Sequence, residues 1–524
     1  MDILRLDINK AQTELPSDSE VRFQAALLAA IAATAASLIA RFAFDAPLVP
    51  ELMAHLIFAV APIWIVEIAV GMLGPFAKHL GFLGCLLAYG LALVGVAACF
   101  LKYRNKAASR PAVFLLPGLA LVLWAATLLV VIPLLGGGLA GAYLKQGAIY
   151  SSLSQLAIYA VYGCVLALVA RSYIDRPEVA LRHNAWLSRR KVMRGVFYSV
   201  IAVAIYDMGK SLILPWWRSG SGRVKGGSGA FPDIDGLAME VTPVPDFYEV
   251  SKNPFDPQVE LERWSLEIGG LVENRLSLTF DDIKSLPSVE QYATLECIDN
   301  KVGGDLIGNA LWRGVRLRDI LEMAQLKQEA IDIVLRASDG YSDSIPVDRA
   351  MFEGTILAYE MNGEPLTPSH GYPLRLIAPG IYGMKNVKWV TRLEAVDFDF
   401  KGYWQSRGWD DRAEYKTMSR IDVPDSGING SATIAGIAFA GDRGISKVEV
   451  STDGGKTWEE AIIKQALSPY SWVLWHKDWT PDRKGKHTLV VRATDGQGIT
   501  QTSEYSPAAP SGATGHHRQT IEVG

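Results

Sequence analysis

The sequence contains few cysteines for its length. There are four among 524 residues, and Cys85, Cys99 and Cys164 lie inside long apolar runs. Cys297 is therefore the only cysteine in the water-soluble part, where an intrachain disulfide is excluded. That part must be stabilised by burial of an apolar core, and about 300 residues can readily supply one.

An excess of positive charge is also missing, and histidines are scarce in the apolar runs. The net charge of -4 gives no indication of nucleic-acid binding. His55 is the only histidine inside an apolar run, with His79 at a loop edge. A transmembrane bis-histidine haem needs two facing histidines, so we expect no haem. Two functions are open for these apolar runs: contact with a quinone, or simple anchoring of the protein in the membrane.

Long apolar runs are abundant, and they are concentrated in the first 215 residues. Six runs are long enough to span a bilayer core of about 30 Å. They cover residues 21–44, 52–73, 80–101, 112–135, 149–170 and 192–214. Six such runs with short connectors favour membrane insertion over buried core helices, so residues 1–214 are predicted to form a membrane α-helical bundle.

Basic residues gather in two of the connecting loops, Lys102–Arg110 and Arg171–Arg194. Loops rich in Lys and Arg stay in the cytoplasm, so the sixth run leads outward. We therefore expect a multi-pass protein of the cytoplasmic membrane whose later residues lie on the periplasmic or extracellular side. Ser188–Arg194 resembles a twin-arginine export signal, and a plain positive-inside anchor is the alternative.

The soluble part divides into a linker and two segments whose sequence patterns differ. Residues 215–238 are rich in Gly and Ser and are predicted to form a flexible linker. Residues 239–412 mix strand-like segments such as Trp264–Ile268 with helix signals such as Thr279, which predicts an α+β domain.

The pattern changes after Arg412. Strand-like segments about ten residues apart, with a hairpin turn at Asp453–Gly455, predict an immunoglobulin-like β-sandwich over residues 413–524. His516 and His517 form too short a motif for a metal site and are expected to lie in solvent.

Cys297 lies where an apolar strand pattern gives way to a Gly-rich turn, within Thr294–Gly304. A lone thiol there can be a buried small hydrophobe, a nucleophile or a soft metal ligand. Its spacing alone leaves all three roles open.

Three segments, in this order along the chain, resemble the sulfite oxidase family of molybdenum enzymes. They are Thr294–Gly304 with the neighbouring Leu311–Val315, then Leu357–Leu366, and then His370–Gly380 running on to Lys385–Trp389. The resemblance implies a sulfite-oxidase-like molybdopterin domain and a dimerisation domain after it. It further implies one pyranopterin holding molybdenum (Mo-MPT), with the Cys297 thiolate as metal ligand.

The same resemblance assigns further site residues. Its pterin contacts fall on Tyr248, Glu249, Ser338, His370, Arg375, Asn386, Val387 and Lys388. Arg375 and Lys388 also suit the pterin phosphate on physical grounds, because a phosphate needs cations and donors. Tyr359 resembles the active-site tyrosine, which can donate a hydrogen bond or pass a proton; a structural tyrosine is the alternative.

Departures from the family pattern bear on the substrate. Sulfite oxidases carry arginines after the cysteine and at the start of the domain, whereas Cys297–Val302 and Tyr248–Asn253 have none and include Glu249 and Asp299. A dianion such as sulfite needs several guanidinium groups, so sulfite specificity is in doubt.

The sequence thus predicts a membrane-anchored molybdenum oxidoreductase for two-electron oxygen-atom transfer on a small sulfur- or nitrogen-containing substrate. Sulfite oxidase proper, or a catalytically inactive membrane sensor or assembly protein, are the alternatives. Nothing resembles a haem-binding b5 module, so an external or membrane electron carrier, a quinone or a cytochrome, is implied. The dimerisation-type domain implies a homodimer.

Overall fold

The computed structural model describes residues 18–61, 65, 76–104, 112–144, 146–173, 231–253, 256–257 and 259–524. These residues form two compact units, a helical one ending at residue 173 and a sheet-rich one beginning at residue 231. The sixth predicted membrane run, the twin-arginine segment and the linker up to residue 230 lie outside the described residues.

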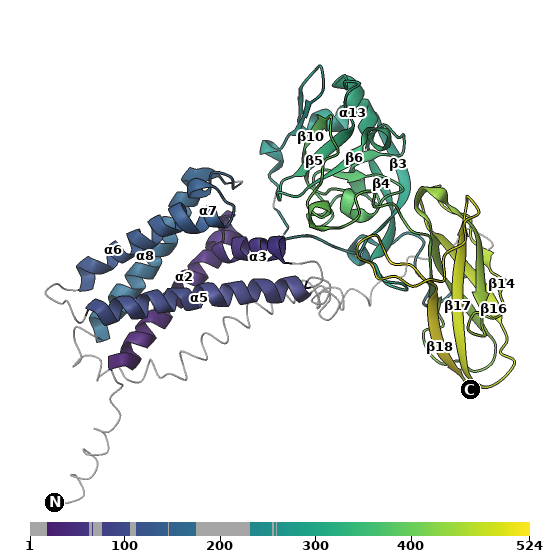
Figure 1. The fold of residues 1–524 in the computed structure, drawn as a ribbon, viewed down its shortest axis with the longest axis horizontal. Coiled ribbons are helices and arrows are strands. Elements are labelled where there is room, and N and C mark those ends of the chain that lie inside the picture. Colours follow the sequence, from purple (N-terminus) through teal and green to yellow (C-terminus); the bar gives the residue numbers. More distant parts are fainter. Residues whose placement is uncertain are drawn as a thin grey trace, which may run out of the picture. The chain divides into compact units, whose positions relative to one another are not determined.

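The first unit is all-helical. Its elements are α2 (Asp18–Phe44), α3 (Val49–Val60), α5 (Phe76–Arg104), α6 (Ala112–Ala126), the π-helical turn η1 (Thr127–Val131), α7 (Ile132–Leu134), η2 (Leu139–Gly141) and α8 (Gly147–Tyr173). Helix α2 packs against α5 and α8, and α8 also packs against α6 (Figure 1). Small residues of α2 such as Ala29 and Ala33 are buried in one core with Leu93 and Tyr162.

Three described helical segments are long and apolar enough to cross a membrane. They are Arg22–Phe44, His79–Tyr103 and Gly147–Val169, and Gly118–Leu134 is a shorter apolar helix. The predicted run 52–73 is not one continuous helix, because α3 ends at Val60 and Ala61 is extended, with ψ 129°. Pro62 follows in the sequence, and the residue before a proline is disfavoured in the helical region.

Two five-stranded sheets organise the first half of the second unit. One has the order β2-β1-β10-β5-β6, with β1 and β10 parallel; the other contains β3, β4, β7 and β8, with β9 paired to β7. The strands are β1 (Leu266–Gly270), β2 (Leu276–Leu278), β3 (Ser288–Glu296), β4 (Ile307–Arg316), β5 (Asp332–Ala337), β6 (Ser342–Pro346), β7 (Ile356–Met361), β8 (Glu364–Pro365), β9 (Arg375–Ile377) and β10 (Val390–Val396).

Short helices connect and cover these strands. They are η4 (Val244–Asp246), η5 (Leu261–Arg263), α12 (Phe280–Ser285), α13 (Leu317–Met323), α14 (Val347–Ala350), η6 (Gly383–Lys385) and η7 (Gln405–Arg407). The predicted helix start at Thr279 is confirmed: Thr279 and Asp282 form a reciprocal capping box. The mixture of strands and helices confirms the α+β prediction for this part of the chain.

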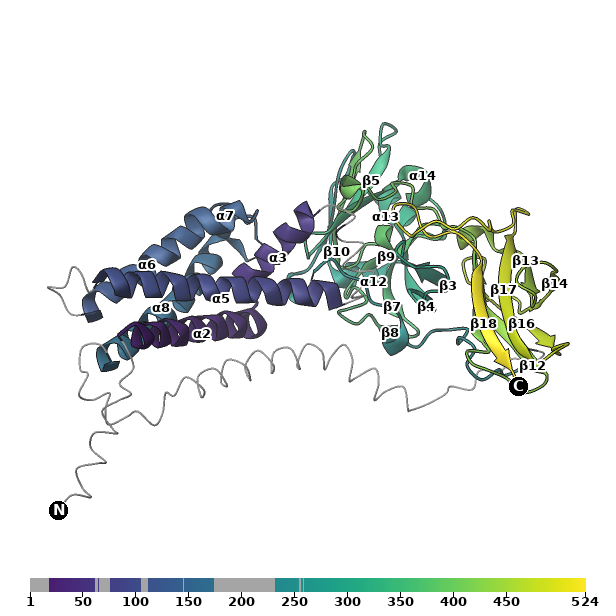
Figure 2. The same cartoon turned by 60° about the horizontal axis from the view of Figure 1, so that its bottom comes forward.

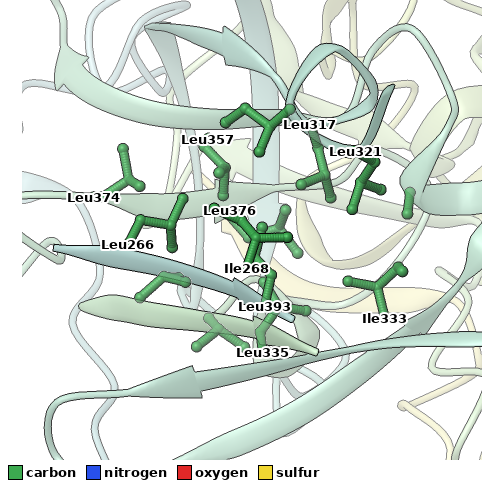
Figure 3. Packing of buried hydrophobic residues seen from close by; sticks show 14 of the residues in the cluster. Leu266, Ile268, Leu317, Leu321, Ile333, Leu335, Leu357, Leu374, Leu376 and Leu393 are labelled. Atoms are coloured by element: carbon green, nitrogen blue, oxygen red, sulfur yellow. The ribbon is translucent and has the colours of Figure 1, made fainter. Parts of the chain in front are cut away.

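An apolar core lies between the two sheets. Leu266, Ile268, Ile333, Leu335 and Leu393 come from the first sheet. Figure 3 shows them meeting Leu357 and Leu376 of the second sheet and Leu317 and Leu321 of α13. Because side chains alternate along a strand, β7 directs Leu357 and Tyr359 into this core, and Ile356 and Ala358 into a second cluster with Trp312. The second cluster also contains Leu295 of β3, two residues before Cys297.

The last part of the chain is rich in antiparallel sheet. Figure 2 shows its strands, which form the sheets β11-β12-β16-β15 and β14-β13-β17-β18. They are β11 (Met418–Val423), β12 (Ala432–Phe439), β13 (Ile445–Ser451), β14 (Glu459–Glu460), β15 (Ile462–Ile463), β16 (Val473–Trp479), β17 (Gly485–Asp495) and β18 (His517–Val523), with η8 (Gly441–Arg443) before β13. Buried side chains of both sheets, Trp475 and Leu489 among them, share one core.

Candidate active site

Cys297 follows directly after the last residue of β3. Its backbone N–H donates to the carbonyl oxygen of Leu306 at 2.9 Å, and its own carbonyl accepts from Asn300 N at 2.9 Å, so both sides of the residue are fixed. The residue is 8% exposed, and burial raises the pKa of the thiol to about 12. A neutral thiol is a poor ligand, so metal binding here requires a cation that displaces the thiol proton.

Three tyrosines surround the thiol. A charge on Cys297 would raise the pKa values of Tyr248, Tyr382 and Tyr415, all of which are already raised by burial. The Tyr415 hydroxyl oxygen accepts from the backbone N–H of Glu296 at 3.3 Å, and the rings of Tyr382 and Tyr415 are 4.8 Å apart. The cysteine therefore faces buried phenols, which can donate hydrogen bonds to a reacting oxygen.

A buried carboxyl group lies beside these phenols. Oε1 of Glu296 accepts from Asn300 Nδ2 at 2.9 Å, while Oε2 is buried without a partner among the described residues. Burial raises the pKa of Glu296 to about 7, and the hydrogen bond from Asn300 opposes the rise. An unpaired buried oxygen is costly, and such groups occur where a ligand or a proton is handled.

Arg375 is the buried cation of the site. It is 5% exposed, and its guanidinium group lies 5.0 Å from the Trp312 ring centre. Nη1 donates to the His370 carbonyl at 3.0 Å, and Nε is buried without a partner among the described residues. Burial lowers its pKa to about 10; Tyr248 and Tyr415 oppose this effect, and no carboxylate of the described residues does. A buried guanidinium with an unused donor fits an anion such as a phosphate.

Lys388 and His370 complete this polar region. Lys388 Nζ donates to the Ser369 carbonyl at 2.8 Å and lies 4.3 Å from the Trp389 ring centre. Burial, with Arg375 nearby, lowers the pKa of Lys388 to about 8. Burial also lowers the pKa of His370 to about 4, so the neutral ring donates from Nε2 to the Val244 carbonyl at 3.0 Å. His370 is therefore a neutral donor and Lys388 a cation.

The electrostatic contacts connect the two regions. Tyr248 and Tyr415 each interact both with the Cys297 thiol and with the Arg375 guanidinium. The thiol and the Arg375 guanidinium thus lie near the same two tyrosines. A thiol and a phosphate-compatible cation that share their neighbours are what a metal-carrying phosphorylated cofactor needs.

Comparison with known proteins decides the family. Residues 253–404 match the oxidoreductase molybdopterin binding domain family, and residues 415–514 match the Mo-co oxidoreductase dimerisation domain family. The chain is 30% identical over 324 residues to the sulfite oxidase of Arabidopsis thaliana, covering 49% of this chain and 81% of that protein. This chain belongs to the sulfite oxidase family.

Two further proteins are similar to this chain. An uncharacterized oxidoreductase of Bacillus subtilis is 36% identical over 155 residues, covering 30% of this chain and 76% of that protein. The sulfane dehydrogenase SoxCD from Paracoccus pantotrophus aligns in three dimensions with a TM-score of 0.50 and 25% identity, over 58% of this chain and 89% of that one. The chain is therefore a molybdopterin-dependent oxidoreductase with a sulfite-oxidase-like domain.

The remaining pterin residues inferred from the family pattern lie around the same region. The Ser338 N–H donates to the Trp389 carbonyl at 3.0 Å, and its Oγ is buried without a partner among the described residues. The Tyr248 hydroxyl borders Gly383, where an added Cβ would lie 2.5 Å from it. Glu249 is exposed, with Oε1 3.9 Å from His370 Nε2. Ser338 and Tyr248 thus place hydroxyl groups in this region, and Glu249 lies at the solvent side.

Asn386 and Val387 lie in the turn that follows η6 and precedes Lys388, and both make hydrogen bonds within the chain. Asn386 Oδ1 accepts from Ala378 N at 2.6 Å, and its Nδ2 donates to the carbonyls of Ile381 and Tyr382. The Val387 carbonyl accepts from Leu376 N at 2.8 Å. The hydrogen bonds of these two residues therefore fix the backbone conformation immediately before Lys388.

Tyr359 is the one predicted site residue that the structure does not bring to this region. Its ring lies in the core between the sheets, 6.2 Å from the Phe280 ring, with Lys284 Nζ 6.0 Å from its centre. Its catalytic role stays a prediction. Tyr382 and Tyr415 were missed from the sequence because Glu296 and Tyr415 are 119 residues apart, and only the fold joins them.

Proposed function

We propose that Cys297 ligates the molybdenum of a single pyranopterin cofactor and that His370, Arg375 and Lys388 hold the cofactor's pterin and phosphate. The observation that carries this proposal is the buried Arg375, whose Nε and charge have no anionic partner among the described residues. Tyr248, Ser338 and the turn at Asn386 and Val387 complete the cofactor site, while Glu249 contributes at its solvent side. When bound, the cofactor supplies two-electron redox chemistry and oxygen-atom transfer.

The chain's own residues then orient the substrate and handle protons. Tyr415 and Tyr382 lie beside the thiol and can donate hydrogen bonds to a substrate oxygen. One buried oxygen of Glu296 has no partner among the described residues and can hold a proton close to them. Because the groups that interact electrostatically with the cysteine include buried phenols and the carboxyls of Asp299 and Glu296, a neutral substrate is favoured over an anion.

The substrate class that we propose is therefore a neutral S-oxide or N-oxide, reduced with loss of its oxygen atom. Sulfite oxidation is the second candidate, favoured by the 30% identity to the Arabidopsis thaliana sulfite oxidase. Purified enzyme should be assayed in both directions, with sulfite and an electron acceptor, and with methionine sulfoxide and a donor dye. We expect methionine sulfoxide turnover to dominate; faster sulfite turnover would establish the second candidate instead.

We further propose that the helical unit anchors the enzyme in the cytoplasmic membrane, with the catalytic part outside the cytoplasm. The three long apolar helices support this proposal, as do the large apolar side chains that point away from the core, such as Leu91 and Leu168. A membrane-embedded quinone or an external cytochrome then exchanges electrons with the site. The expectation that the chain itself binds no haem stays a prediction.

The limits of the parts are also proposals: 1–214 for the membrane bundle, 215–238 for the linker, 239–412 for the molybdopterin domain and 413–524 for an immunoglobulin-like domain. The shared core of the two C-terminal sheets supports the last of these.

The match to a dimerisation family supports a homodimer. Light scattering of the purified protein would measure the mass of the assembly. The inactive-sensor alternative predicts protein without stoichiometric molybdenum, which metal analysis distinguishes.

A further inference from the structure

The turn after Cys297 is held by a side chain from the C-terminal sheets. Arg420 on β11 donates from Nη1 to the Gly304 carbonyl at 2.8 Å. Its Nε is fixed by Asp422 Oδ1 at 2.6 Å, and Asp422 Oδ2 accepts from Ala238 N at 3.1 Å. The guanidinium is therefore fixed in the position from which it donates to the turn.

A second C-terminal side chain packs on the same turn. Gly303 has φ +75°, and a Cβ added there would lie 2.4 Å from Cδ2 of His517. His517 is itself held, because its Nδ1 accepts from Ile421 N at 3.0 Å. The expectation that this histidine lies in solvent is therefore wrong: it is half-buried against the turn.

A series of hydrogen bonds connects the turn at Gly303 and Gly304 to the backbone of Cys297. Asn300 Oδ1 accepts from Leu306 N at 3.1 Å, and the Leu306 carbonyl accepts from Cys297 N at 2.9 Å. A Cβ on Gly304 would lie 2.4 Å from Asn300 Oδ1, so the two residues are in close contact. A shift of Gly304 must therefore move Asn300, and with it the backbone of Cys297.

The strand before Cys297 is held from the same side. Thr294 N donates to the Tyr470 carbonyl at 3.0 Å, and Trp472 N donates to Thr294 Oγ1 at 2.9 Å. Ser468 Oγ donates to the Tyr292 carbonyl at 2.6 Å. Because β3 is an edge strand of its sheet, these bonds fix its otherwise unpaired edge.

We propose that Arg420 is a positioning residue for Cys297, acting through Gly304 and Asn300. The C-terminal sheets are then part of the scaffold of the active site, in addition to any role between subunits. This inference rests on the proposed role of Cys297 as the molybdenum ligand. Arg420 borders a surface depression beside Gly303 and Asp305, so a shorter side chain there admits solvent and leaves no sealed void.

The test compares R420M and R420K with wild type in the purified full-length holoenzyme. Hydrogen exchange read by mass spectrometry reports on residues 298–306, and the Mo(V) electron paramagnetic resonance spectrum reports on the metal's surroundings. Loss of a charge-assisted hydrogen bond should accelerate exchange in R420M about tenfold or more. We expect altered Mo(V) g-values as well, and recovery of both readouts in R420K, whose ammonium can still reach the carbonyl.

The matched control is R492M. Arg492 also lies in the C-terminal sheets and donates to a carboxylate, Glu449 Oε2, at 2.9 Å, but it does not contact the turn. R492M should leave both readouts as in wild type. An R420M protein with wild-type exchange and g-values, or equal changes in R492M, would overturn the proposal. Persistence of the wild-type spectrum in C297S would instead overturn the assignment of the metal ligand, while the exchange result would still stand.

Discussion

Replacing Lys385 with methionine tests how the turn before Lys388 is held. Lys385 and Asp343 form a buried ion pair, with Nζ 3.0 Å from Oδ1 and side chains 3% and 0% exposed. Asp343 also accepts from Ser344 N, the Tyr341 hydroxyl and Gln405 Nε2, so its hydrogen-bonding capacity is used. In K385M the carboxylate keeps these neutral donors and loses its only close buried cation among the described residues.

The expected loss follows from this geometry. Removing one partner of a buried pair costs about 3–5 kcal/mol, because the other charge stays buried. Differential scanning calorimetry of the full-length protein should show the sheet-rich unit melting about 10 °C lower. The double variant D343N/K385M removes both charges, so it should regain much of the lost stability.

The pH dependence gives a second readout with a defined sign. Burial raises the pKa of Asp343 above its ordinary value even with Lys385 present, and loss of Lys385 raises it further. A carboxyl whose pKa is higher in the folded than in the unfolded state stabilises the fold below the unfolded pKa and loses that contribution as pH rises. The deficit of K385M should therefore shrink as the buffer is acidified from about pH 8 to about pH 5.

Lys401 provides the control. It pairs with Asp399 and Asp411 at the surface, where its side chain is 47% exposed, so K401M should cost less than about 1 kcal/mol. Equal stability losses in K385M and K401M, or a K385M deficit that grows on acidification, would refute this reasoning.

Three further predictions concern the cofactor, the chemistry and the membrane. R375M should bind the molybdenum cofactor about thirtyfold or more weakly than wild type, as measured by metal analysis after dialysis. Without the cofactor, R375M should melt at a temperature at least as high as that of cofactor-free wild type, because an unpaired buried charge is removed. A lower melting temperature of cofactor-free R375M would contradict the proposed role of Arg375. Y415F should lower kcat about a hundredfold with unchanged cofactor content, measured by steady-state assay; wild-type kcat would exclude a role for the phenol. The wild-type chain should stay in the membrane pellet after an alkaline carbonate wash and require detergent for release, and recovery in the wash would contradict membrane insertion.

Much of the local structure was readable from sequence because it depends on neighbouring residues. The strand that ends at Glu296, just before Cys297, follows from an apolar segment that leads into a Gly-rich turn, and the capping box at Thr279 follows from a four-residue pattern. The end of α3 at Val60 was missed because hydropathy ignores the proline that follows Ala61.

The site was only partly readable because it depends on tertiary contacts. The cationic and backbone positions from His370 to Lys388 lie close in sequence and do converge in the fold. The position of a tyrosine beside Cys297 depends on which of the two apolar clusters each face of β7 enters, and on where the chain returns after residue 412. Tyr359 points into the core between the sheets, whereas Tyr415 reaches Glu296 from far along the chain.

The most direct test of the account is X-ray absorption spectroscopy at the molybdenum edge, performed on wild type and on C297S. If the Cys297 sulfur is bonded to the metal, the serine variant must show one sulfur neighbour fewer around molybdenum, with an oxygen or nitrogen neighbour in its place. An unchanged number of sulfur neighbours in C297S would contradict the central claim.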